Sequence, residues 1–195
     1  MGHTIAVILS GGRSSRMGRD KAGLPLGRET FLDRLTTGLT PLFDRVYVSV
    51  DRPGRYPGRR ELPDLRPGQG PLAGLEAAFR STAAEAVFLA AVDLPFAAPA
   101  LAAKVLERAG EGDACVIRRR DGKAEPLFAL YRRSCLGPLT GCLDQGRRAV
   151  MALLDRVDCR WLAEEELPEF DLERMLWNVN TGQEYRRAVA VEEEG

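Results

Sequence analysis

The sequence is poor in the side chains that many enzymes use for metal binding and nucleophilic catalysis. Its 195 residues include one histidine, His3, close to the start of the sequence. Neither a Ser–His–Asp triad nor a histidine-rich metal centre can be built within one chain from a single imidazole. Hydrolases and metalloenzymes of these kinds are therefore excluded.

Cysteine is also scarce, and its spacing is not that of a functional site. The four cysteines, Cys115, Cys135, Cys142 and Cys159, form no C-x-x-C pair. Redox motifs and zinc ribbons need such closely spaced pairs. We therefore expect four buried, reduced thiols.

Long apolar runs and a net charge of either sign are missing as well. No stretch approaches the 18 apolar residues of a membrane span, and no basic, apolar leader precedes the first strand-like segment. Lys plus Arg and Asp plus Glu both number 28, so the formal net charge is zero. This balance disfavours a basic nucleic-acid binder. We expect a cytoplasmic protein that binds neither nucleic acid nor membrane.

The hydrophobic pattern predicts strands and helices in alternation. Three apolar runs are typical of strands buried on both faces, namely residues 5–9, 46–50 and 86–92. Helical spacing, caps or proline starts predict helices over 31–42, 71–80 and from residue 99, with a short extended segment near 61–65. The pattern indicates a three-layer α/β fold with a mostly parallel sheet, in which ligands bind beyond the carboxyl ends of the strands.

The second half of the sequence predicts an antiparallel addition to this sheet. Asp121 and Gly122 form a turn signal between extended segments at 114–118 and 124–131. Helices over 136–143 and 148–154, a strand near 159–162 and a helix from Thr181 follow. The arginines at 118–120 are expected to form a solvated sheet edge, although they would also attract an anionic substrate.

A glycine-rich segment with four cations follows the first predicted strand. It runs from Leu9 to Lys21 and includes Gly11, Gly12 and Arg16. Glycines let backbone N–H groups approach phosphates, whose charge the cations neutralise. The spacing matches neither G-x-G-x-x-G nor G-x-x-x-x-G-K-[ST]. By itself the segment is either a phosphate loop or a turn.

Two further segments lie where such a fold places its ligands. In residues 69–75, Pro71 can begin a helix, and Gly74 permits close packing. Asp93 ends the third predicted strand, before Pro95. At this position a carboxylate either holds Mg²⁺ together with phosphate oxygens or caps the next segment.

Taken together, these segments resemble a known family. Leu-x-Gly-Gly-x-Ser-x-Arg-Met-Gly-x-Asp-Lys from residue 9, Gly-Pro-Leu-Ala-Gly from residue 70 and Val-Asp-Leu-Pro from residue 92 occur in this order. The chain thereby resembles the molybdenum cofactor guanylyltransferases, which are MobA-like nucleotidyltransferases. Residues 125–131 and 178–181 extend the resemblance over nearly the whole chain.

The resemblance implies a Rossmann-like nucleotidyltransferase domain over residues 1–195, in which 1–110 bind nucleotide and 111–195 mainly bind molybdopterin. Its implied activity transfers GMP from Mg-GTP to the terminal phosphate of molybdopterin and releases pyrophosphate. GTP, molybdopterin and Mg²⁺ are the implied substrates and cofactor. Apo-molybdoenzymes and cofactor-delivery proteins are further candidate partners.

The resemblance also implies roles for particular residues. Lys21, Arg16 and Asp93 would be catalytic, and Asp93 would be the magnesium ligand. The residues implied to contact the nucleotide are Leu9, Ser10, Gly11, Gly12, Lys21, Asp51, Asp64 and Asp93, with Asp51 and Asp64 on the guanine side. Asn178 and Asn180 would face the pterin.

Three other functions remain open from the sequence. Asp51 stands where the family often has asparagine, so a CTP-dependent transferase acting on the same cofactor is an alternative. A nucleotidyltransferase for a sugar or polyol phosphate is the second. The third is a carrier module that binds nucleotide and cofactor without catalysis. Nucleotide preference and pyrophosphate release distinguish them.

Overall fold

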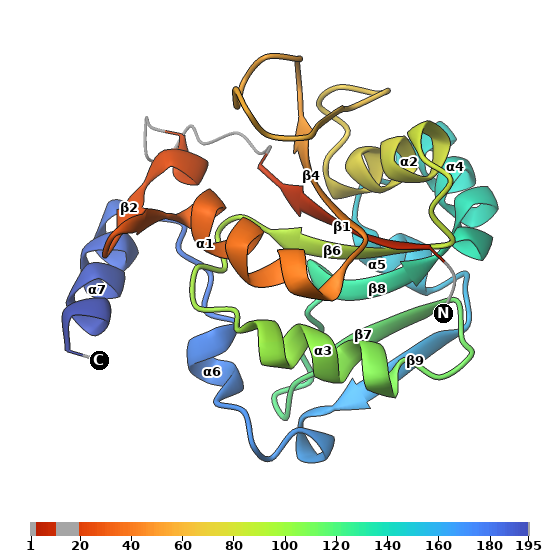
Figure 1. Cartoon of the computed structure of the whole chain (residues 1–195). Coiled ribbons are helices and arrows are strands. Elements are labelled where there is room, and N and C mark those ends of the chain that lie inside the picture. Colours follow the sequence, from red (N-terminus) through yellow and green to blue (C-terminus); the bar gives the residue numbers. More distant parts are fainter. Residues whose placement is uncertain (1–2, 11–19, 195) are drawn as a thin grey trace.

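A seven-stranded sheet forms the centre of the protein. The computed structural model describes residues 3–10 and 20–194 (Figure 1). The strands lie in the order β5-β4-β1-β6-β8-β7-β9. Their bounds are Thr4–Leu9 for β1, Arg45–Val50 for β4, Glu61–Pro63 for β5, Ala86–Ala91 for β6, Ala114–Arg118 for β7, Phe128–Arg132 for β8 and Cys159–Ala163 for β9. β8 runs antiparallel to β6 and β7, whereas the other pairs are parallel. The predicted mostly parallel sheet with an antiparallel section is confirmed.

Helices cover both faces of the sheet, which gives three layers. One face packs against α1 (Phe31–Leu39) and α3 (Pro99–Arg108), and the other against α2 (Pro71–Ser81), α4 (Leu136–Asp144) and α5 (Val150–Leu154). Beyond the first face lie α6 (Leu172–Met175) and α7 (Gly182–Glu193), and α7 contacts a small hairpin of β2 (Pro25–Leu26) and β3 (Glu29–Thr30). Within the described part of the chain, no helix has the length and apolar character to cross a membrane.

The central strand β1 is apolar at successive positions because both of its faces are covered. Ala6 and Ile8 contribute to the core under α1 and α3, whereas Ile5, Val7 and Leu9 contribute to the core under α2 and α4. A strand with one solvated face would alternate apolar and polar residues instead. The expected doubly buried strand is therefore confirmed.

Helix α1 begins as its sequence predicts and ends earlier. The Thr30 hydroxyl accepts from the Asp33 N–H, and the Asp33 carboxylate accepts from the Thr30 N–H, so the pair forms a capping box. The α-helix ends at Leu39 and continues as the 3-10 turn η3 (Thr40–Leu42). Pro41 lacks the N–H that another α-helical bond requires, which accounts for the change.

The arginines at 118–120 do not form a sheet edge, so that prediction is wrong. β7, which ends at Arg118, lies between β8 and β9. Arg119 pairs with Glu125 at 3.6 Å, and Arg120 pairs with Glu165 at 3.1 Å. The sequence of residues 118–120 could not settle this point, because a charged segment beside a hairpin does not reveal which strand of the sheet lies outermost.

The cysteines form no disulfide, and three of the four are buried as expected. All four are free; Cys115, Cys135 and Cys142 are buried, and Cys159 is partly buried. Burial raises the pKa of Cys115 and of Cys159 to about 11, and that of Cys135 to about 12. These three therefore carry protons near neutral pH and are poor nucleophiles.

Gly74 lets α2 approach the sheet closely. A Cβ at this position would lie 2.7 Å from Leu9 Cδ2 and 2.9 Å from Ser49 Oγ. We expect Gly74→Ala to lower the free energy of unfolding by about 1–3 kcal/mol, because the added methyl overpacks this contact. Urea denaturation would measure the loss. Gly137→Ala is the control, because no atom outside its immediate neighbours and its own helix backbone lies within 4 Å of the added Cβ. Equal stability of the two variants would contradict the packing role.

Candidate functional site

The predicted site residues gather along one edge of the sheet. Ser10, Asp51 and Asp64 follow the carboxyl ends of β1, β4 and β5, and Asp93 lies two residues beyond the end of β6. These four strands are parallel neighbours, so their carboxyl ends share this edge. The predicted residues Gly11, Gly12 and Arg16 lie outside the described part of the chain.

Lys21, Asp93 and Asn180 form a hydrogen-bonded cluster at the centre of this edge. Lys21 Nζ donates to Asn180 Oδ1 at 2.6 Å and to Asp93 Oδ2 at 3.3 Å. Lys21 opens the 3-10 turn η2 (Lys21–Gly23), whose cap Asp20 accepts from the Ala22 N–H at 3.2 Å. The side chains of Lys21 and Asp93 are only 15% and 21% exposed. The ammonium group is thus fixed by two oxygen acceptors in a largely desolvated position.

The second carboxylate oxygen of Asp93 remains without a protein partner. Its Oδ1 atom is buried and makes no hydrogen bond in the described structure. An unpaired buried carboxylate oxygen is costly unless a ligand completes its contacts. Across residues 3–10 and 20–194, no group of three or more His, Cys, Asp or Glu side chains is placed to hold a metal. Asp93 fits a cation whose other ligands are phosphate oxygens and water.

Backbone contacts and a helix cap place Asn180 beside Lys21. The Val179 N–H donates to the Asp93 carbonyl at 2.9 Å, which joins this segment to the end of β6. The Glu184 carboxylate accepts from the Asn180 N–H at 2.8 Å and closes a capping box with Thr181. The Asn180 N–H is the main cause that lowers the pKa of Glu184. Our sequence reasoning missed Glu184, although the T-x-x-E spacing signals a capping box.

Asp64 lies on the other side of β1, next to two serines. The Ser49 hydroxyl donates to Asp64 Oδ1 at 2.8 Å, and the Ser10 hydroxyl donates to the Ser49 carbonyl at 2.6 Å. Burial raises the pKa of Asp64 despite the Ser49 hydrogen bond, and the charge of Asp51 raises it further. Asp64 therefore presents a partly desolvated carboxylate that gains from added hydrogen-bond donors.

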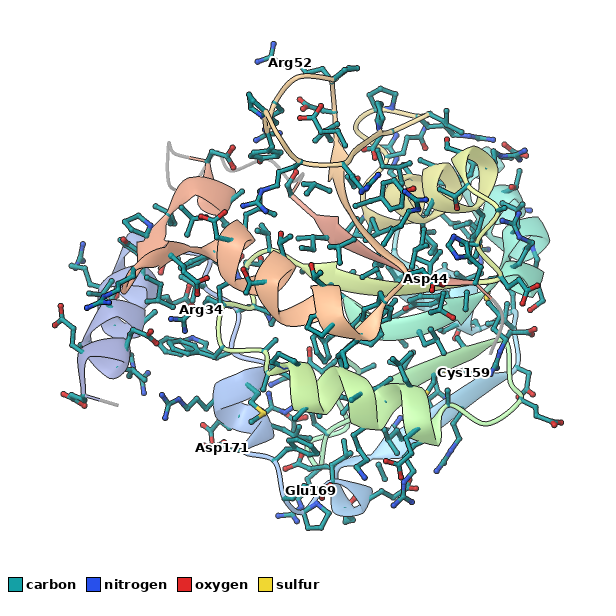
Figure 2. The ribbon with its side chains drawn as sticks, in the orientation of Figure 1. Arg34, Asp44, Arg52, Cys159, Glu169 and Asp171 are labelled. Carbon is teal, nitrogen blue, oxygen red and sulfur yellow. The ribbon has the colours of Figure 1, made fainter. Side chains whose placement is uncertain are left out.

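Asp51 is more exposed than Asp64 and already has a cationic partner. Arg55 Nη1 donates to Asp51 Oδ1 at 3.1 Å, and Arg55 Nη2 lies 3.3 Å from Asp20 Oδ2. The Tyr56 hydroxyl donates to the same Asp20 oxygen at 2.9 Å, and burial raises the pKa of Tyr56 to about 12. The sequence did not indicate Arg55 or Tyr56, because their loop has no periodic pattern. Arg52 marks the outer end of this loop in Figure 2.

A buried carboxylate supports the segment that follows Asp64. Glu76 of α2 is 1% exposed, and its two oxygens lie 2.9 Å from Arg66 Nε and 3.0 Å from Arg80 Nε. The Arg66 pair joins the loop to α2. Sequence reasoning missed Glu76, because a glutamate in an apolar helix does not indicate which cations will contact it.

The two predicted acceptor-binding asparagines face different surroundings. Asn180 contacts Lys21, whereas Asn178 lines a neighbouring pocket of about 450 Å³ with Arg118, Lys123 and Glu125. The Asn178 amide donates weakly to the Leu176 carbonyl at 3.4 Å. The structure therefore does not bring the pair together, although both lie near Asp93.

Comparison of the sequence with known proteins identifies one family. A family model described as the MobA-like NTP transferase domain matches residues 6–159. A probable molybdenum cofactor guanylyltransferase from Pelotomaculum thermopropionicum is 36% identical over 178 residues, which cover 90% of this chain and 86% of that protein. Another, from Carboxydothermus hydrogenoformans, is 34% identical and covers 98% of both.

A solved structure agrees with these sequence relatives. The crystal structure of molybdopterin-guanine dinucleotide biosynthesis protein A from Archaeoglobus fulgidus superposes with a TM-score of 0.84 at 25% identity. The superposition covers 98% of this chain and 100% of that one. The likeness therefore extends over the sheet, both helical layers and the C-terminal helix.

Proposed function

Since the chain belongs to the MobA-like NTP transferase family, we propose that it transfers GMP from Mg-GTP to the terminal phosphate of the molybdenum cofactor. The named relatives support this choice of nucleotide and acceptor. The structural observation that carries the proposal is the cluster of Lys21, Asp93 and Asn180 at the middle of the sheet edge. It offers a fixed cation and an unpaired carboxylate oxygen side by side, as transfer between phosphates requires.

The proposed reaction needs no protein nucleophile. An oxygen of the acceptor phosphate forms a bond to the α-phosphorus of GTP, and the bond from that phosphorus to the bridging oxygen breaks. Pyrophosphate leaves with the electron pair of the broken bond. Negative charge then increases on the transferred and leaving groups, so a cation fixed in advance lowers the barrier. We assign this role to Lys21, which Asp93 and Asn180 position.

Asp93 is the residue that we expect to hold the divalent ion. Its unpaired Oδ1 can contribute one ligand, while triphosphate oxygens and water supply the rest. When bound, Mg²⁺ would neutralise phosphate charge as a Lewis acid. The choice of magnesium follows from its usual partnership with nucleotide phosphates.

Asp64 is our principal candidate for recognition of guanine. A carboxylate can accept from the guanine N1–H and 2-amino groups together, a donor pair that cytosine lacks. Asp51 already pairs with Arg55, so its contribution would be smaller. Four further expectations remain predictions. They are the contacts of Leu9 and Ser10 with the nucleotide, the division of roles between residues 1–110 and 111–195, the additional partners and a cytoplasmic location.

Calorimetric titration with GTP, CTP and ATP, each with and without Mg²⁺, tests the proposal. We expect GTP to bind tightest and its affinity to depend on Mg²⁺. Addition of molybdopterin should then release one pyrophosphate per GTP consumed, which a carrier module would not do. Preference for CTP would reassign the protein to the cytidylyl reaction.

Recognition of GTP should weaken in acid because Asp64 must be ionised to accept both guanine donors. Since the pKa of Asp64 is raised, it binds a proton at a higher pH than an ordinary aspartate. GTP affinity should therefore be highest above this raised pKa and fall as the pH decreases through it. Calorimetry from pH 7 downward measures the fall. Asp64→Asn should bind more weakly at pH 7 and show a smaller fall than the wild type; an unchanged profile would exclude the assignment.

A further inference from the structure

We propose that Glu125 recognises the heterocycle of the acceptor, in a pocket on the opposite side of Asp93 from Asp64. The inference rests on the proposed function, because that function supplies an acceptor with a pterin ring and a terminal phosphate. The pocket holds about 450 Å³ and is lined mainly by the end of β7, the turn before β8, and single residues from α5 and the segment after α6.

The sheet order separates the pocket from the guanine side. Asp64 follows β5 and Asp93 follows β6, whereas Arg118 ends β7, two strands beyond β6. Neighbouring strands lie about 4.8 Å apart, so the end of β7 is roughly 10 Å from the end of β6. A ring in the pocket would therefore place a phosphate on a short linker near Asp93.

Backbone hydrogen bonds join the segments that carry the pocket to those that carry the catalytic cluster. The Ala91 N–H donates to the Leu127 carbonyl at 2.8 Å, two residues from both Asp93 and Glu125. The Val179 N–H donates to the Asp93 carbonyl at 2.9 Å, one residue from the pocket-lining Asn178. A ligand in the pocket is thus positioned by segments that also position Asp93.

Glu125 is fixed in place, and Arg119 is its ion-pair partner in the described part of the chain. Its N–H donates to the Ile117 carbonyl at 3.0 Å, and its carbonyl accepts from the Phe128 N–H at 3.1 Å. Its side chain is 14% exposed, and Arg119 Nη1 lies 3.6 Å from Oε1, beyond a good hydrogen bond. Burial raises the pKa of Glu125, while Arg119 opposes that rise. Such a carboxylate gains from a ligand that donates two hydrogen bonds.

The other lining groups suit the same ligand. A 2-amino-4-oxo ring presents its 2-amino group and the adjacent ring N–H side by side, which matches the two oxygens of Glu125. Pro126 and Met151 offer apolar contact, and Met151 is 41% exposed. Arg118, held 3.8 Å over the Trp161 ring, adds positive charge for an anionic acceptor. The set combines a carboxylate, an apolar surface and a cation.

Two stable probes test this assignment without the labile cofactor. One is 6-hydroxymethylpterin, and the other is 6-hydroxymethyllumazine, in which an oxo group replaces the 2-amino group. We expect the wild-type chain, titrated by fluorescence, to bind the pterin about 10- to 100-fold more tightly, because the oxo group faces the carboxylate and a charged hydrogen bond is lost. Glu125→Gln should reduce this ratio to near one while GTP affinity stays unchanged.

Glu165→Gln is the matched control, because Glu165 is exposed and outside the pocket lining. It should retain the wild-type ratio. A wild-type ratio near one, no pterin binding by the wild type, or an unchanged ratio in Glu125→Gln would each overturn the role of Glu125. The ratio of pterin to lumazine affinity is measured without nucleotide. A ratio that contradicts the role of Glu125 can therefore be told apart from a preference for CTP, which would overturn the proposed function instead.

Discussion

Replacement of Asp93 by asparagine is expected to lower the turnover number by about 1000-fold or more, because the change removes the carboxylate that we assign to the divalent ion. The side chain keeps its size, and the backbone contact between the Asp93 carbonyl and Val179 is retained. The measurement is the rate of pyrophosphate release at saturating GTP and molybdopterin across a range of Mg²⁺ concentrations.

The same variant should still fold, so that its loss of turnover reports the metal role. Loss of the charge removes the desolvation cost of the unpaired Asp93 Oδ1 but also removes the ion pair with Lys21, and these two effects on stability oppose each other. Urea denaturation checks this, and Asp155→Asn at the exposed end of α5 is the control, with near-normal turnover. An unchanged Mg²⁺ dependence in Asp93→Asn would disprove the metal role.

Replacement of Lys21 by alanine is expected to lower the turnover number by about 100- to 1000-fold, the effect of removing one preorganised charge-stabilising donor. The loss should appear in kcat more than in GTP affinity, because charge on the transferred phosphate increases only in the transition state. Single-turnover pyrophosphate release together with GTP titration separates the two effects.

Lys104→Ala is the control for Lys21→Ala, since Lys104 pairs with Glu107 on α3, away from the site edge. It should turn over at the wild-type rate. A near-normal rate in Lys21→Ala would instead assign the main cationic role to Arg13 or Arg16, which precede it in the glycine-rich segment.

The fold was predictable because its signals are local. The apolar runs that became β1, β4 and β6, and the proline starts of α2 and α3, needed no long-range information. The order of the later strands was not predictable in this way. β8 enters between β6 and β7, and β9 pairs with the outer side of β7, so the expected arginine-rich edge is an interior strand end.

The positions of the site residues were more predictable than their contacts. Asp93 ends a buried strand, so parallel-sheet geometry alone places it at the ligand edge. The separation of Asn178 from Asn180 depends instead on tertiary packing, and so does the role of Tyr56 in holding Asp20. Such contacts join segments far apart in the sequence, where no periodic pattern applies.

The hydrogen bond between Lys21 and Asn180 can form only after most of the chain has been synthesised. The two residues are separated by 159 positions. At a synthesis rate of about 5–20 residues per second, the cation exists for roughly 10 to 30 seconds before its amide partner is made. Strands β1, β4, β5 and β6 can assemble a nucleotide-binding edge in that interval, yet Lys21 is not fully positioned. The complete cluster is therefore formed only late in synthesis.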